Sequence, residues 1–165
     1  MNTPLAEMLR YNKWANLILF EACRTLSDEH IDAPLPGASG SVRELLLHIA
    51  GGQQTFVLRT TGRQHEGELQ RRSPWPCFEA LLDVLTRTSD ELIAIAAGLD
   101  TDREVDLPFL TKVYRYPVGF FLTHAMAHGA VHRTEITLTL AHIGVEPPDL
   151  DGWAYGAAAG YGHEV

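Results

Sequence analysis

The sequence predicts an all-α fold, a four-helix bundle with a short irregular or hairpin crossover before the last long helix. Two observations support this class. Four segments repeat apolar residues at spacings of three and four, and strand-like patterning is confined to residues 99–116. The length of 165 residues is that of one domain, so we expect residues 1–165 to form a single one. Long amphipathic segments of this kind are typical of helix bundles.

The first helix is predicted from about Pro4 to Leu26. Thr3 can cap its N-terminus, and proline suits the first helical turn. The expected buried face consists of Leu5, Met8, Leu9, Ala15, Ile18, Ala22 and Leu26. The Ser-Asp-Glu sequence at residues 27–29 is expected to end the helix, and the prolines and glycines after it predict a loop.

The second and third helices have clear start and stop signals. Ser41-Val42-Arg43-Glu44 matches a capping box, in which the serine hydroxyl and the glutamate carboxylate each bond the other residue's backbone N–H. Gly62 is a suitable C-terminal stop for this helix. The third helix follows the Pro-Trp-Pro sequence at residues 74–76, and Gly98 is expected to close it.

The fourth helix is predicted from about Pro117 to Ile143, because Gly144 and two prolines follow. A short C-terminal helix is expected within residues 149–160, carrying Trp153 and Tyr155. Core packing is favoured over pocket lining for each of the three tryptophans, at positions 14, 75 and 153.

Charge and composition limit the class of function. The formal net charge is −8, which disfavours nucleic acids and anionic membrane surfaces. No apolar run is long enough to span a membrane, and the N-terminus does not resemble a signal peptide. We therefore expect a cytoplasmic protein with a small-molecule partner. Cys23 and Cys77 lack metal-site spacing and are expected to be free and partly buried.

Three histidines repeat every four residues on the fourth helix: His124, His128 and His132. A four-residue step advances about 40° around a helix, so the imidazoles form a row on one side. The apolar seam places His132 near its centre, His128 still inward and His124 at the edge. Its members are Phe121, Ala125, Ile136, Leu140 and Ile143. A pair at i and i+4 can hold one metal ion, although this pair lacks the internal glutamate of the zinc-protease motif.

His48, on the second helix, is the natural third ligand, because a catalytic metal site usually has three protein ligands and one open position. The alternative for His48 is a hydrogen-bonded core histidine, which is the commoner role of a buried imidazole. His124 could cap the bundle, donate to a ligand or be half exposed. For His128 and His132 together, a shared metal would satisfy nitrogens that otherwise cost about 1–3 kcal/mol each when buried without partners.

Three stretches together resemble a known family. They are residues 11–16 (YNKWAN), residues 41–49 ending in Leu-Leu-His-Ile, and residues 124–133 (HAMAHGAVHR) followed by Leu-Ala-His-Ile-Gly. In this order and over nearly the whole chain they resemble the DinB-like superfamily of four-helix-bundle proteins. The resemblance implies a divalent metal held by His48, His128 and His132, with His124 not a ligand, and it implies a homodimer. Thr134-Glu135 departs from the Gly-Gln common in the family.

Imidazole ligands suit zinc and nickel, and iron less specifically. By resemblance, the protein is a metal-dependent enzyme, a thiol-dependent S-transferase that uses a low-molecular-weight thiol on small molecules. The alternatives are a metal-dependent hydrolase and a non-catalytic bundle that binds a metal or ligand. No catalytic residue is identified from the sequence. Arg133 could attract a carboxylate, be a surface charge or be a helix-end partner, and Glu135 is an untested candidate for a general base.

Overall fold

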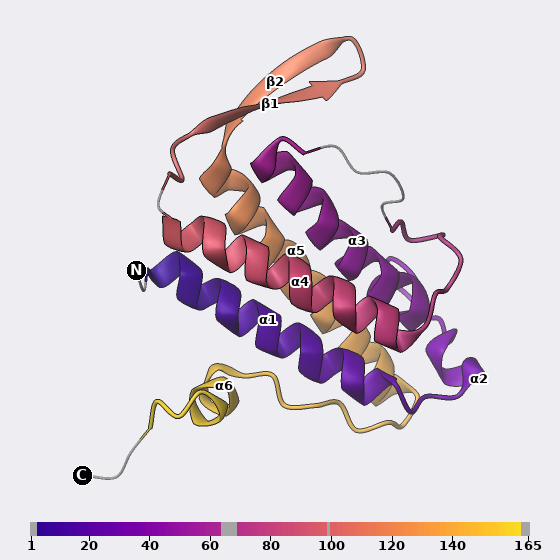
Figure 1. Cartoon of the computed structure of the whole chain (residues 1–165). Helices are drawn as coiled ribbons and strands as arrows, with labels where there is room; N and C mark the ends of the chain where they lie inside the picture. Colours follow the sequence, from indigo (N-terminus) through magenta and orange to yellow (C-terminus); the bar gives the residue numbers. More distant parts are fainter. Residues whose placement is uncertain (1–2, 64–68, 99, 163–165) are drawn as a thin grey trace.

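The computed structural model describes residues 3–63, 69–98 and 100–162, and its four long helices form a bundle (Figure 1). These helices are α1 (Pro4–Cys23), α3 (Val42–Thr61), α4 (Phe78–Gly98) and α5 (Val118–His142). Both α1 and α3 pack against α4 and α5. The helices α3 and α5 run in opposite directions, so residues near the start of α3 face residues near the end of α5 (Figure 1). The predicted all-α bundle is confirmed.

The predicted helix ends are largely correct, because local capping determines them. The Thr3 side chain accepts a hydrogen bond from the backbone N–H of Ala6. Both halves of the capping box between Ser41 and Glu44 are formed. Gly62 ends α3 with a φ of +71°, a conformation that favours glycine, and its N–H bonds the carbonyl of Leu58. The Glu44 carboxylate therefore has a structural role, because it accepts a hydrogen bond from the backbone N–H of Ser41 in the capping box.

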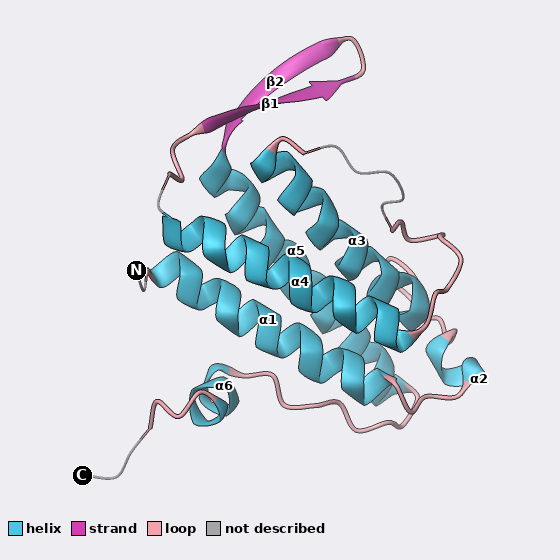
Figure 2. Ribbon diagram, viewed as in Figure 1, coloured by secondary structure: helices cyan, strands magenta, loops and turns pink. Residues whose placement is uncertain are grey.

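A β-hairpin forms the crossover between α4 and α5 (Figure 2). Its strands β1 (Glu104–Phe109) and β2 (Lys112–Pro117) pair antiparallel, from Glu104 opposite Pro117 to Phe109 opposite Lys112. It extends from the end of the bundle where α3 ends and α5 begins (Figure 1). Leu107 and Tyr116 pack against the apolar cluster at that end, so the hairpin is attached to the bundle by side chains as well as by the chain.

The buried face of α1 differs from the predicted one. Met8 is 51% exposed and Ile18 is 38% exposed, whereas Asn12 and Asn16 are buried. A pattern based on apolar residues alone places the face wrongly, because polar side chains with buried partners occupy part of it. The expected loop after α1 is also partly wrong. The helix ends at Cys23, and the Ser27 hydroxyl caps a short helix, α2 (Asp28–Ile31).

The C-terminal helix α6 (Gly152–Ala158) is short and packs against α1. Tyr155 donates a hydrogen bond to Glu7 of α1 at 2.5 Å. Trp153 is 88% exposed, so the expectation that it packs in the core is wrong. Both cysteines are free. Cys23 is buried, but Cys77 is exposed, so the expectation that it is partly buried is wrong. Among the described residues, no helix has the length and apolarity needed to cross a membrane.

Candidate metal centre

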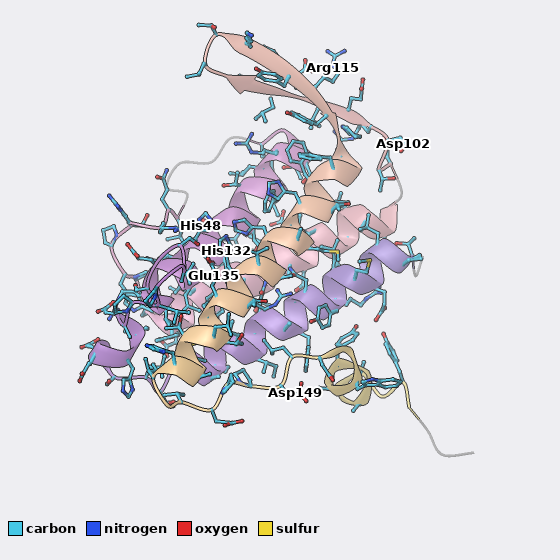
Figure 3. All side chains as sticks on the ribbon, turned by 180° about the vertical axis from the view of Figure 1, so that it is seen from behind. His48, Asp102, Arg115, His132, Glu135 and Asp149 are labelled. Carbon is cyan, nitrogen blue, oxygen red and sulfur yellow. The ribbon has the colours of Figure 1, made fainter. Side chains whose placement is uncertain are left out.

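The structure brings His48, His128 and His132 together between α3 and α5. Figure 3 shows His48 and His132 close to each other. The Nε2 atoms of His48 and His128 are 3.0 Å apart. One nitrogen from each of the three rings lies within 4.8 Å of the other two. The ring centroids are 4.5–4.7 Å apart in all three pairs. This cluster, called the triad below, combines one side chain from α3 with two from α5, as the periodicity predicted.

Gly52 gives the His128 ring room to reach the triad. It lies one turn after His48 on the same face of α3. A Cβ atom built at Gly52 would lie 2.7 Å from Cε1 of His128 and 3.2 Å from its Nδ1. Carbon atoms in ordinary contact are about 3.5–4.0 Å apart, so any side chain at this position would displace the imidazole. The glycine is therefore a requirement of the triad's geometry.

Glu135 orients His132 from the side away from the triad. Its Oε2 atom is 2.5 Å from Nδ1 of His132, one turn earlier on α5. The same carboxylate accepts hydrogen bonds from the backbone N–H and the hydroxyl of Ser39. The Ser39 carbonyl in turn accepts from the Arg71 guanidinium. When Nδ1 of His132 donates to Glu135, the Nε2 atom of His132 keeps a lone pair that can bind a metal. This arrangement is usual for histidine ligands of metals.

Burial keeps two triad imidazoles neutral. Burial, together with the nearby charges of Arg71 and His132, lowers the pKa of His48 to about 4. Burial likewise lowers the pKa of His128 to about 3, with contributions from His132 and His48. Burial alone would raise the pKa of Glu135, but hydrogen bonds from His132 and Ser39 outweigh it and hold that pKa below its ordinary value. At neutral pH the site thus offers neutral imidazoles, the form that binds metals.

The donor set fits a divalent cation. Zinc binds imidazole nitrogen at about 2.0–2.1 Å, which in tetrahedral geometry separates two ligand nitrogens by about 3.3 Å. The separation of 3.0 Å between His48 and His128 is close to that value. Without a shared cation, two neutral Nε2 atoms at this distance can share only one proton between them. A cation held by these three nitrogens would have a fourth coordination position open, as in catalytic metal sites.

A cavity of about 790 Å³ opens beside the triad. We call it the α3–α5 groove. Its α3 side includes His48, Gly52, Phe56 and Arg59, and its α5 side includes His128 and His124. The hairpin residues Leu107 and Tyr116 line it at the end where α3 stops. A volume of this size is typical of pockets for small molecules.

An aromatic row continues from the triad along the groove. Its members are Tyr116, Phe120, His124, His128 and His132, each four residues from the next. Neighbouring ring centroids in this row are 4.5–6.1 Å apart. His124 is exposed and packs on Phe56, with centroids 4.9 Å apart, so it belongs to the groove wall and not to the triad. The same four-residue spacing in the sequence could have revealed Phe120 and Tyr116 as members.

One protein-family model matches nearly the whole chain. The family model described as "DinB family" matches residues 1–163. The chain belongs to the DinB family. Its fold is similar to that of a DinB-like protein from Bacillus cereus, with a TM-score of 0.65, 18% identity, and coverage of 88% of this chain and 94% of that one. A DinB-like protein from Bacillus subtilis gives a TM-score of 0.61, 19% identity and coverage of 90% and 99%. No curated protein matches the sequence at a significant level.

In this DinB protein, Arg133 is a buried structural residue. It is 4% exposed, and its Nη1 atom donates to Asn12 at 2.7 Å and to Asn16 at 2.6 Å. The alternative of a surface charge is therefore wrong. Asn16 continues the network to Gln53 on α3, which donates to Thr88 and Ser89 on α4. The network joins all four long helices and fixes the rotation of α5 at the residue that follows His132.

Several further residues of the site are not evident from the sequence. Ser39 and Arg71 come from two loops, and no spacing rule relates them to the triad. Glu135 was considered as a general base, but its oxygens are engaged with His132 and Ser39, so the structure gives it a positioning role. Neither Trp14 nor Trp75 is among the residues that line the α3–α5 groove.

Proposed function

We propose that this DinB protein is a metal-dependent enzyme in which His48, His128 and His132 hold one divalent cation. Zinc and nickel are preferred over iron as the bound metal. The observation that carries the proposal is the convergence of three imidazole nitrogens within 4.8 Å of one another, with two of the rings, His48 and His128, lining a cavity. A divalent cation with three neutral ligands retains its full charge, and it would lower the pKa of a water or thiol in its open position.

The residues around the triad support chemistry on an anionic nucleophile. Glu135 fixes the tautomer of His132, and burial keeps His48 and His128 neutral at neutral pH, so that one nitrogen of each ring has a free lone pair. The Arg71 guanidinium, held by the Ser39 carbonyl, adds positive charge close to His48. A positive field of this kind stabilises a thiolate relative to its thiol. The groove beside it can admit both a thiol and a small electrophile.

We therefore propose a thiol-dependent S-transferase, in which a low-molecular-weight thiol releases its proton to water and its sulfur displaces a leaving group from an electrophilic small molecule. The work of the protein is to bind, orient and shield the two reactants, since proximity is a large part of such catalysis. We further propose a cytoplasmic location, where such thiols are kept reduced, and a homodimer, which light scattering after size exclusion would test.

The test is turnover of monochlorobimane, an electrophile that becomes fluorescent when a thiol displaces its chloride. Zinc- or nickel-loaded protein is compared with chelator-treated protein, using cysteine, glutathione and coenzyme A as thiols. The proposal expects a rate above the uncatalysed one only with both metal and a thiol. Equal rates with and without metal would contradict it. Hydrolysis of an activated ester without thiol would favour the hydrolase, and metal-dependent melting without any turnover would favour a binding protein.

A further inference from the structure

The charged residues that line the described part of the α3–α5 groove are all positive, and the proposed chemistry needs only the one beside the triad. Among the described residues that line the groove there are two arginines, Arg59 and Arg71, and no aspartate or glutamate. The whole chain, by contrast, carries a formal charge of −8. A concave site lined by positive side chains attracts anionic ligands, even when the protein as a whole is negatively charged.

Arg59 is the more informative of the two arginines. Among the described residues, its guanidinium has no hydrogen bond or ion pair, and its Nη1 atom is buried without a partner. A buried donor on a cation is costly when unsatisfied, so such groups in folded proteins normally have a partner. Arg71, at the triad end, already donates to the Ser39 carbonyl. Of the two described arginines that line the groove, Arg59 is therefore the one with an unpartnered guanidinium donor.

Arg59 lies far from the triad along the groove. It is eleven residues after His48 on α3, which corresponds to about 16 Å along the helix axis. Between these two positions the wall is mainly aromatic, formed by Phe56, Phe120 and Phe121, with Thr55 and His124 also lining it. The groove thus has a reactive end, an aromatic middle and a cationic far end.

We infer that the α3–α5 groove binds an elongated organic anion, with a carboxylate, phosphate or sulfonate at Arg59 and an apolar or aromatic body against Phe56 and Phe120. This inference rests on the proposed function only in placing the other end of the ligand at the triad. The geometry of the unpartnered guanidinium and the aromatic wall carries the rest. A planar guanidinium can present a pair of N–H groups that matches the two oxygens of such an anion.

The test uses biphenyl-4-carboxylate and its uncharged match biphenyl-4-carboxamide as probes, with affinities from isothermal titration calorimetry. Each probe is titrated into zinc-loaded and chelator-treated protein, and circular dichroism checks the fold of both forms. The same titrations are made with Arg59→Met and with the control Arg72→Met. Arg72 is exposed, does not line the groove, and its loss changes the net charge equally.

We expect the carboxylate to bind wild type at least tenfold more tightly than the carboxamide, with or without metal. Arg59→Met should abolish this preference, and Arg72→Met should retain it. Equal affinities of the two probes in wild type, no binding of either, or a preference that survives Arg59→Met would overturn the inference. A preference that disappears with the metal would also overturn it, because the carboxylate would then be a ligand of the cation.

The design separates this inference from the proposed function. Zinc stoichiometry of Arg59→Met should equal that of wild type, because Arg59 does not contact the triad. If the protein binds no metal at all, the anion preference is still measurable in the chelator-treated protein. If it binds metal but shows no anion preference, the metal centre stands and the inference on the ligand fails.

Discussion

The substitution Gly52→Ala tests the metal centre without removing any ligand. The added Cβ would lie 2.7 Å from Cε1 of His128. The ring would have to move by about 0.8 Å to restore an ordinary carbon contact of about 3.5 Å. It has little room, because His48, His132 and Phe56 pack around it, with centroids 4.6, 4.5 and 5.6 Å away. Metal–ligand distances normally lie within about 0.2 Å of their usual values, so a shift of about 0.8 Å would spoil the bond to His128.

We therefore expect Gly52→Ala to weaken zinc binding about 100-fold, or about 2.8 kcal/mol. The fold should not weaken in parallel, since alanine is favoured over glycine within a helix by about 0.8–1 kcal/mol. Competition with a chromophoric zinc chelator measures the affinity, and thermal unfolding of the metal-free protein measures the stability.

The matched control is Gly156→Ala, which makes the same change in α6. No atom lies within 4 Å of a Cβ built at that glycine. It should bind zinc as wild type does. Unchanged zinc affinity in Gly52→Ala would refute the reasoning, because His128 would then not need its present position to bind the metal.

Three further predictions concern the surroundings of the triad. Glu135→Gln should weaken zinc binding about tenfold by chelator competition, because a neutral amide holds the His132 tautomer less strongly than a carboxylate; wild-type affinity would count against a positioning role. Arg133→Met should lower the free energy of unfolding by about 2–4 kcal/mol in urea titrations, because two buried asparagine oxygens lose their donor; a change under about 0.5 kcal/mol would contradict the network. Metal-free protein should lose stability as the pH falls from 6.5 toward 4, because the unfolded chain then binds protons that folded His48 and His128, with pKa values of about 4 and 3, do not. His128→Ala should show a smaller loss over this range, and an equal loss would assign the effect to other groups.

The sequence was sufficient where local rules determine structure. The capping box at Ser41 and the glycine stop at Gly62 gave both ends of α3. The helical period of the histidines placed His128 and His132 on one face, and a search for a third ligand led to His48. These steps depend on backbone geometry within one helix, which is nearly the same in every protein.

The sequence was insufficient where the structure depends on contacts between side chains of elements far apart in the chain. Asn12 and Asn16 occupy a buried face of α1 because Arg133, more than a hundred residues later, needs acceptors there. A hydrophobic pattern cannot anticipate this, so it assigned Met8 and Ile18 to the core instead. The contact between Ser39 and Glu135 is likewise made across the fold. The role of Gly52 follows only from the distance between α3 and the His128 ring.

The central claim is that His48, His128 and His132 hold one divalent cation. The most direct measurement is elemental analysis of protein loaded with zinc or nickel and then desalted. Wild type is compared with His128→Ala and with His142→Ala, an exposed histidine at the end of the same helix. We predict one equivalent of metal in wild type and His142→Ala, and less than a tenth of that in His128→Ala. A full equivalent in His128→Ala, or none in wild type, would contradict the claim.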